Sequence, residues 1–213
     1  MHAVTGSTRT SWVNTMSAYL KKCQHWVFDM DGTLTIAVHD FLHIRRILEI
    51  PEHADILEHL ASLPDTEAQQ KNAWLLEHER QLAMNSQPAP GAIELVQHLH
   101  AQGRDLAILT RNAKELARLT LEAIDLIDYF SDPLIFGREQ AIPKPHPDGL
   151  LKIAQHWQVA PQHMAMVGDF QMDLKAAQAA GSYAVQVNTT NNLWPELTDF
   201  HATDCNALTK LLL

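Results

Sequence analysis

Two carboxylates directly follow a short apolar run near the start of the chain. Asp29 and Asp31 come after residues 26–28, Trp-Val-Phe, and Gly32 follows them. Aromatic and β-branched residues in so short a run favour a buried strand that ends at Asp29. Side chains alternate along an extended backbone, so both carboxylates begin on the same side before Gly32 allows a sharp turn. Like charges this close require either a cation between them or one group that stays protonated and serves as an acid.

Further polar residues follow two other apolar runs. They are Thr110, Arg111 and Asn112 after residues 105–109, and Gly168 and Asp169 after residues 164–167. Ligands bind at the carboxyl ends of parallel strands, so we expect these side chains to meet Asp29 at one edge of a sheet. Lys144 lies between two prolines, which restrict the backbone and can aim its ammonium group at the same cleft.

These residue types are the ones needed to move a phosphoryl group through an aspartyl intermediate. Asp29 would attack phosphorus from the end of a rigid strand. Asp31 would protonate the leaving oxygen and would later take a proton from the water that hydrolyses the acyl phosphate.

The predicted substrate-binding groups follow the second strand and include the lysine. Thr110, with the backbone N–H groups of Arg111 and Asn112, would bind phosphate oxygens at a helix N-terminus, where the helix dipole favours anions. Lys144 would balance the negative charge of the transition state.

A hard divalent cation would reduce the repulsion between the Asp29 carboxylate and the anionic phosphate. Mg²⁺ prefers oxygen ligands, and Asp29, the backbone carbonyl of Asp31 and Asp169 would supply part of its shell. Asp173, one helical turn beyond Asp169, would orient metal-bound waters or Lys144.

Each of these residues has a simpler interpretation when it is taken alone. Asp-x-Asp-Gly can form a turn, Thr110 can cap a helix, Lys144 can be a solvated charge, and Asp173 can be an ordinary acidic residue in a first helical turn. Their joint occurrence after successive predicted strands is what favours a catalytic site.

Composition narrows the class of protein. The chain has 213 residues, of which 46% are hydrophobic and 19% charged, and this suits one globular domain with at most a modest insertion. A net charge of -9 without a basic block disfavours nucleic acid and anionic membranes as partners, and leaves a small-molecule phosphate ester as the expected one.

The cysteines and the hydropathy indicate the compartment. The two cysteines, Cys23 and Cys205, predict free thiols, and the absence of a long apolar run predicts a cytoplasmic protein. The sequence leaves the oligomeric state open.

Hydrophobic periodicity predicts an α/β fold with a parallel sheet covered by helices on both faces. The expected strands span residues 26–28, 105–109, 134–136, 164–167 and 183–187. The expected core helices span residues 91–102, 113–123, 147–157 and 171–180. Three further helices, near 38–49, 52–62 and 66–85, would form an all-helical insertion after the first strand.

The four polar segments resemble the motifs of the haloacid dehalogenase-like hydrolase superfamily, phosphatase branch. The motifs are matched by residues 29–35, by Thr110, by Lys144 between its prolines, and by residues 168–173. The resemblance implies a Rossmann-like core at 23–35 and 89–213 and a helical cap at 36–88. Residues 1–15 are rich in Ser and Thr and show little periodicity, so we expect residues 1–22 to form a partly disordered leader. The resemblance also implies Asp29 as nucleophile, Asp31 as acid/base, and a Mg²⁺ site at Asp29, Asp31 and Asp169.

One residue departs from the family pattern, and it leaves the reaction class unchanged. Relatives often carry Ser or Thr after the fourth-motif Gly-Asp, whereas this chain has Phe170. Within the superfamily the chain is most similar to phosphoglycolate phosphatase-like enzymes, which makes phosphoglycolate one candidate substrate. Arg45 or Arg46 in the cap would then meet an anionic part of the substrate, although a solvated helix face also explains both arginines.

Three other functions fit parts of the pattern. A haloacid dehalogenase would use the same nucleophile on carbon, but it needs no second carboxylate such as Asp31. A phosphomutase of the β-phosphoglucomutase type would return the phosphoryl group to its substrate, and nothing in the sequence excludes it. A binding protein that keeps the fold without turnover would not need both Asp29 and Asp31.

Overall fold

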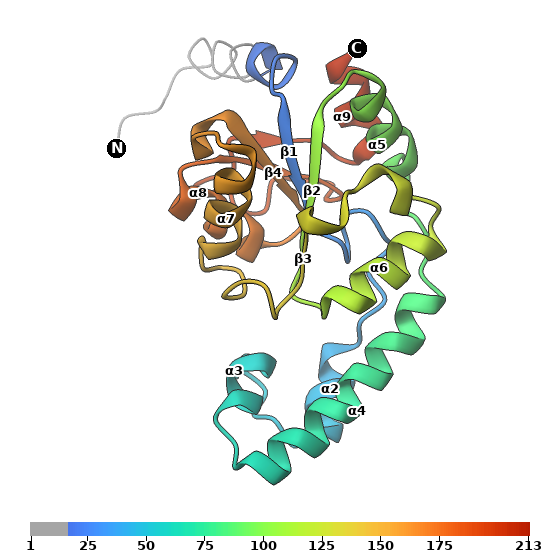
Figure 1. Cartoon of the computed structure of the whole chain (residues 1–213), viewed down its shortest axis with the longest axis vertical. Coiled ribbons are helices and arrows are strands. Elements are labelled where there is room, and N and C mark those ends of the chain that lie inside the picture. Colours follow the sequence, from blue (N-terminus) through green and yellow to red (C-terminus); the bar gives the residue numbers. More distant parts are fainter. Residues whose placement is uncertain (1–16) are drawn as a thin grey trace.

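A parallel sheet runs through the centre of the protein (Figure 1). The computed structural model describes residues 17–213, in which six strands lie in the order β3-β2-β1-β4-β5-β6. Every neighbouring pair of strands is parallel. The strands are β1 (His25–Phe28), β2 (Asp105–Leu109), β3 (Ile135–Phe136), β4 (Met164–Gly168), β5 (Tyr183–Gln186) and β6 (Phe200–His201). The predicted α/β parallel sheet is therefore confirmed.

Alternating side chains of the central strand divide the core into two layers. Trp26 and Phe28 belong to one hydrophobic cluster, whereas Val27 belongs to the other. The first layer includes residues of α5 (Ala92–Ala101), α6 (Lys114–Ala123) and α9 (Cys205–Leu212). The second includes residues of α7 (Asp148–Trp157) and α8 (Gln171–Ala180). Because both faces are covered, the central strands β1, β2 and β4 are mostly apolar, as expected for a parallel sheet.

The predicted boundaries agree closely with the structure in the central part of the core. Strand β2 and helix α8 span the predicted residues, and the other core elements differ by one or two positions. Short 3-10 helices, which the sequence did not predict, are η1 (Ile127–Tyr129), η2 (Asp132–Leu134) and η3 (Pro161–His163). Strand β6 and helix α9 were also not predicted. Two half-buried residues in β6 are too few to show a periodic pattern.

Three helices lie between β1 and α5 and form the helical insertion. They are α2 (Phe41–Ile47), α3 (Ile56–Ala61) and α4 (Asp65–Met84). The first two begin about three residues later than predicted because aspartates cap them. The Asp40 carboxylate accepts the N–H of His43, and the Asp55 carboxylate accepts the N–H groups of Leu57 and Glu58.

The insertion has a small hydrophobic cluster of its own. Its buried members are Ile44, Leu48, Ile50, Leu60 and Leu75. The chain enters and leaves the insertion through two paired segments. The Ile36 N–H donates to the Gln87 carbonyl at 3.0 Å, and the Ala89 N–H donates to the Leu34 carbonyl at 2.9 Å. The long helix α4 then packs against α6 of the core (Figure 1).

Part of the predicted leader belongs to the core. Residues 1–16 lie outside the described part of the chain, but Leu20 is buried in the first layer together with Cys23. Tyr19 and Leu20 therefore pack with the core, whereas Lys21 and Lys22 are exposed, so the core begins before the predicted boundary at residue 22. Both Cys23 and Cys205 are free and buried thiols, as predicted. Within residues 17–213, no helix has the length and hydropathy that a membrane span requires.

Candidate active site

A cavity of about 500 Å³ lies between the carboxyl ends of the strands and the helical insertion. All eight residues that the sequence singled out for chemistry line it. They are Asp29, Asp31, Thr110, Arg111, Asn112, Lys144, Asp169 and Asp173. The carboxyl ends of β1, β2 and β4 bring most of these side chains together, because neighbouring parallel strands end at the same edge.

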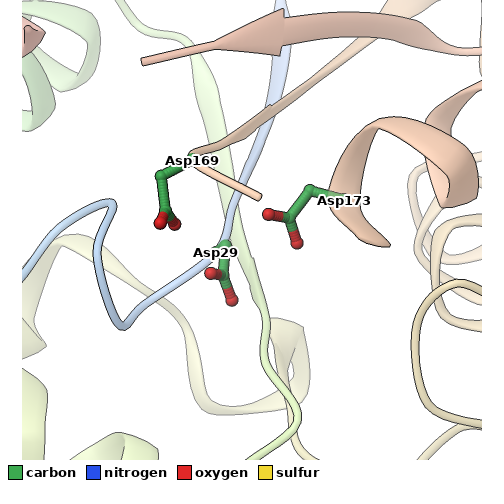
Figure 2. A group of neighbouring side chains, drawn as sticks. All are labelled: Asp29, Asp169 and Asp173. Carbon is green, nitrogen blue, oxygen red and sulfur yellow. The ribbon is translucent and has the colours of Figure 1, made fainter. Parts of the chain in front are cut away.

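Three carboxylates form a cluster at this edge (Figure 2). One oxygen atom from each of Asp29, Asp169 and Asp173 lies within 4.8 Å of the other two. Burial, followed by the nearby Asp173 charge, raises the pKa of Asp29 well above its ordinary value, although Lys144 opposes this shift. The same two causes raise the pKa of Asp169 to about 6. The cluster therefore concentrates more negative charge than its own surroundings neutralise.

Lys144 is the cation that the protein itself supplies to this cluster. Its ammonium lies 2.6 Å from an Asp29 oxygen and 2.7 Å from an Asp173 oxygen, and its side chain is 2% exposed. Burial alone would lower the pKa of Lys144, but the charges of Asp173 and Asp29 raise it. The other Asp173 oxygen accepts the N–H of Phe170 at 3.1 Å. Asp173 is thus fixed at the start of α8 and holds Lys144 against Asp29.

Two glycines allow the carboxylates to approach the backbone. A Cβ atom at Gly32, which has φ +84°, would lie 2.4 Å from an Asp169 oxygen. A Cβ atom at Gly168 would lie 2.4 Å from the Asp173 carboxylate. Thr33, next to the first glycine, donates its hydroxyl to Asp169 at 3.0 Å. The turn after β1 and the end of β4 are therefore packed around the acidic side chains.

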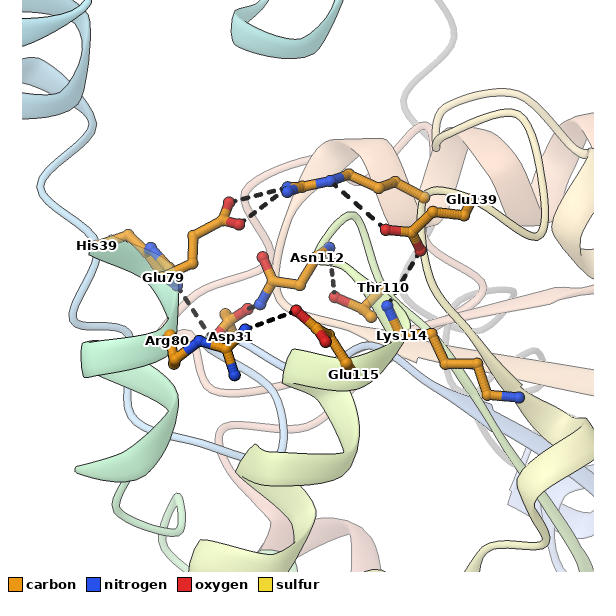
Figure 3. A network of polar contacts seen from close by, with 10 residues as sticks. Asp31, His39, Glu79, Arg80, Thr110, Asn112, Lys114, Glu115 and Glu139 are labelled. Atoms are coloured by element: carbon orange, nitrogen blue, oxygen red, sulfur yellow. Dashed lines mark hydrogen bonds and ion pairs between the residues drawn. The ribbon is translucent and has the colours of Figure 1, made fainter. Parts of the chain in front are cut away.

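Asp31 lies in different surroundings from Asp29 (Figure 3). The Asn112 side-chain amide donates to one Asp31 oxygen at 2.6 Å, and His39 Nε2 lies 3.3 Å from the other. Burial would lower the pKa of His39, but the hydrogen bond and charge of Asp31 outweigh it and raise that pKa. Asp31 is held by hydrogen-bond donors, whereas Asp29 is held by an ammonium.

The predicted substrate-binding residues have protein partners in the structure. The Thr110 hydroxyl accepts the N–H of Asn112 at 3.1 Å. Arg111 lies 2.5 Å from the Asp55 carboxylate of the insertion and donates to the Lys144 carbonyl at 2.7 Å. Arg111 therefore joins the core to the start of α3, and a substrate contact for these residues stays a prediction.

Three titratable residues of the cavity were missed by sequence reasoning. His39 precedes the capping residue of α2, and its position soon after the first motif was a usable signal, which was overlooked among 13 histidines. Asp55 lies inside the helix predicted near 52–62, so it was not recognised as the residue that caps α3 beside the cavity. Glu79 lies within α4, where burial raises its pKa against the opposing effect of Arg138, which it contacts at 2.9 Å. No local pattern distinguishes Glu79 from the other acidic residues of that helix.

The acidic cluster fits a hard divalent cation. Mg²⁺ takes oxygen ligands in a compact octahedral shell, and Asp29, Asp169 and Asp173 offer carboxylate oxygens in one small region. The raised pKa values of Asp29 and Asp169 show that a further positive charge would favour their ionised forms. The Asp31 side chain is not part of this cluster, so its predicted contribution through the backbone carbonyl stays a prediction.

Comparison with known proteins identifies the family. Residues 24–181 match the model of the haloacid dehalogenase-like hydrolases. A haloacid dehalogenase-like hydrolase domain-containing protein of Arabidopsis thaliana is 31% identical over 80% of this chain and 73% of its own length. A phosphoglycolate phosphatase of Nitrosospira multiformis is 32% identical over 70% of this chain and 65% of its own length.

A solved structure has the same fold. The crystal structure of a hydrolase from Pseudomonas syringae superimposes with a TM-score of 0.74 at 23% identity, and the match covers 88% of this chain and 96% of that one. The family model covers more than half of the chain. The chain belongs to the haloacid dehalogenase-like hydrolase family.

Proposed function

We propose that this protein is a magnesium-dependent phosphatase that hydrolyses a small phosphomonoester through an aspartyl-phosphate intermediate on Asp29. The observation that carries the proposal is the unequal pairing of two carboxylates that line one cavity. Asp29 contacts the Lys144 ammonium, whereas Asp31 accepts hydrogen bonds from neighbouring donors. The Lys144 contact favours the ionised form of Asp29 that a nucleophile needs, whereas Asp31 lies apart from that ammonium and lines the same cavity, where it would exchange a proton with the substrate.

The chemical steps assign one role to each carboxylate. An Asp29 oxygen attacks phosphorus, and the bond from phosphorus to the leaving oxygen breaks as Asp31 donates a proton to that oxygen. A water molecule then attacks the phosphorus of the acyl phosphate, and Asp31 accepts its proton. The bond between Asp29 and phosphorus breaks, which releases inorganic phosphate and restores the Asp29 carboxylate and the protonated Asp31.

The surrounding residues support these steps by position and charge. Lys144 lies where it would neutralise phosphate oxygens next to Asp29, and Asp173 keeps it there. Thr110, at the end of β2, faces the same cavity and would bind a phosphate oxygen. Bound Mg²⁺, held by Asp29, Asp169 and the Asp31 carbonyl, would supply positive charge to the attacked phosphoryl group.

The decisive experiment assays a panel of phosphomonoesters with Mg²⁺, with EDTA, and with the Asp29→Asn variant. We expect release of inorganic phosphate only from the wild-type protein with Mg²⁺. 2-Phosphoglycolate belongs in the panel because of the relative named above. Turnover that persists in EDTA or in the Asn variant would contradict the proposal.

The same panel separates hydrolysis from phosphoryl return to the substrate. Phosphorus NMR of a hexose 1-phosphate incubated with the enzyme would show inorganic phosphate for a phosphatase and a hexose 6-phosphate for a mutase. We expect inorganic phosphate. A hexose 6-phosphate as the main product would support the mutase instead.

A further inference from the structure

The helical insertion lines the cavity mainly with apolar side chains. Its contributions include Phe41 and Ile44 from α2, Ile56 and Leu57 from α3, and Leu75 from α4. Phe41 is 54% exposed, although it stacks on the His39 ring at a centroid distance of 5.6 Å. A large aromatic side chain that borders a cavity and stays half exposed is a surface on which a ligand can pack.

The core adds an aromatic side chain to the same cavity. Phe170 directly follows Asp169, lines the cavity and is 45% exposed. Its ring is held edge-on by Trp194, with ring centroids 5.5 Å apart. Phe170 therefore places an apolar surface immediately beside the acidic cluster.

The basic side chains of the cavity are already bonded to protein groups in the described part of the chain. Arg45 donates to the carbonyls of Ala54 and Phe41, and Arg111 pairs with Asp55. The ammonium of Lys144 lies between Asp29 and Asp173. At Lys144 or Arg111, a second anionic group on the substrate, such as the carboxylate of phosphoglycolate, would have to displace a carboxylate that already pairs with the cation.

From this distribution of apolar and charged groups, and resting on the phosphatase function proposed above, we propose that the enzyme selects phosphomonoesters whose leaving alcohol carries an apolar body. The phosphate would lie at the carboxylate cluster, and the apolar body would extend between Phe170 and the insertion helices. Phe41 and Phe170 are the specificity-determining residues, and a small ester with a second anion is a poor substrate.

A homologous series of alkyl phosphates tests this inference because the reacting group stays the same. We would measure kcat/KM with Mg²⁺ for ethyl, propyl, butyl, hexyl and octyl phosphate. Burial of each methylene group contributes about 0.8 kcal/mol, so kcat/KM should rise about fourfold per methylene until the cavity is filled. Propyl phosphate, similar in size to 2-phosphoglycolate, should exceed it by about tenfold or more. A flat series, or a preference for 2-phosphoglycolate, would overturn the inference.

Substitutions at the two exposed phenylalanines locate the effect. Phe41→Ala and Phe170→Ala should each reduce the ratio of kcat/KM for hexyl to that for ethyl phosphate by about tenfold. Leu42→Ala is the matched control, because Leu42 lies beside Phe41 on α2, is 68% exposed and does not line the cavity. It should keep the wild-type ratio. An unchanged ratio in both Phe variants would contradict the assignment.

The series also separates failure of this inference from failure of the proposed function. Hydrolysis of every ester at similar kcat/KM would refute only the apolar specificity. Failure to hydrolyse any phosphomonoester with Mg²⁺ would refute the phosphatase function itself.

Discussion

The parallel sheet and the helical insertion bury their apolar residues to very different extents. Strands β1, β2 and β4 are covered on both faces, and the side chains of Trp26, Val27 and Phe28 are fully buried. The insertion buries only a small cluster, and six of the eleven exposed large hydrophobic residues among residues 17–213 lie within it. These are Ile36, Val38, Phe41, Leu42, Ile47 and Met84.

The difference suits two separate tasks. Catalysis requires carboxylates held at fixed positions, and buried strands that end at one edge provide them. Recognition of an apolar leaving group requires apolar side chains that are not already packed, and the insertion provides those. We therefore expect mutations in the core to change the chemistry and the global stability. Mutations in the insertion should change binding and local stability.

The largest effect is expected from Asp31→Asn in the core. General acid–base catalysis contributes about 10²–10⁴-fold, so steady-state turnover should fall by that factor. With p-nitrophenyl phosphate the leaving group needs little protonation, so the first step should survive while hydrolysis of the acyl phosphate slows. Stopped-flow measurement should therefore show a burst of about one equivalent of p-nitrophenol.

Asp29→Asn is the control for that experiment, because it removes the nucleophile and should give no burst. A near-normal steady-state rate in Asp31→Asn would mean that the second carboxylate is not the acid/base. Asp29 would then remain the proposed nucleophile, but the acid/base would have to be another residue.

Matched leucine truncations compare the stabilities of the two regions directly. Leu99 of α5 and Leu60 of α3 are each 1% exposed, but they belong to the large core cluster and to the small insertion cluster respectively. Leu99→Ala should lower the global free energy of unfolding by about 2–5 kcal/mol. Leu60→Ala should mainly increase hydrogen exchange within residues 41–84, with a smaller shift in the urea midpoint.

Equal shifts of the global midpoint would contradict this expectation. They would show that the insertion unfolds together with the sheet as one cooperative unit. The comparison between the two regions would then hold for their function but not for their stability.

The sequence predicted the carboxylate-bearing part of the site because those residues follow strongly apolar runs. Asp29 and Asp169 lie at strand ends, where parallel topology determines their neighbours. Glu79 and Asp55 could not be found in this way. Their approach to the core depends on how α3 and α4 pack against it, and helical periodicity alone does not determine that packing.

The same reasoning explains the errors at the element boundaries. Side-chain caps at Asp40 and Asp55 begin the insertion helices later than the periodic pattern suggests. Leu20 was assigned to a leader because the chain before it is rich in Ser and Thr and shows little periodicity. Its position in the core is evident only in the folded structure, where it lies in the same hydrophobic cluster as Trp26 and Phe28.

A moderate effect is expected from the ion pair that joins the two regions beside the cavity. Asp55→Asn keeps an oxygen that can cap α3 but removes the charge that pairs with Arg111. The pair is partly exposed, at 21% and 25%, and its loss should cost about 1 kcal/mol. The fraction of molecules in which the insertion occupies its binding position would then fall. KM should therefore rise about fivefold with little change in kcat.

Steady-state kinetics on a hydrolysed ester check this expectation. An unchanged KM would show that the Asp55–Arg111 pair does not control the position of the insertion. A fall in kcat alone would instead place Arg111 in the transition state, closer to its role predicted from sequence.

The smallest effect is expected from a second ion pair between the same two regions. Arg80 of α4 lies 2.8 Å from Glu115 of α6, but the side chains are 38% and 55% exposed (Figure 3). Exposed pairs contribute about 0.2–1 kcal/mol, so Glu115→Gln should change the free energy of unfolding by at most about 0.5 kcal/mol and leave KM unchanged. Because salt screens exposed charges, even this difference should vanish near 1 M NaCl. If Glu115→Gln raised KM as much as Asp55→Asn, the position of the insertion would depend on all of its ion pairs with the core, and not on the Asp55–Arg111 pair in particular.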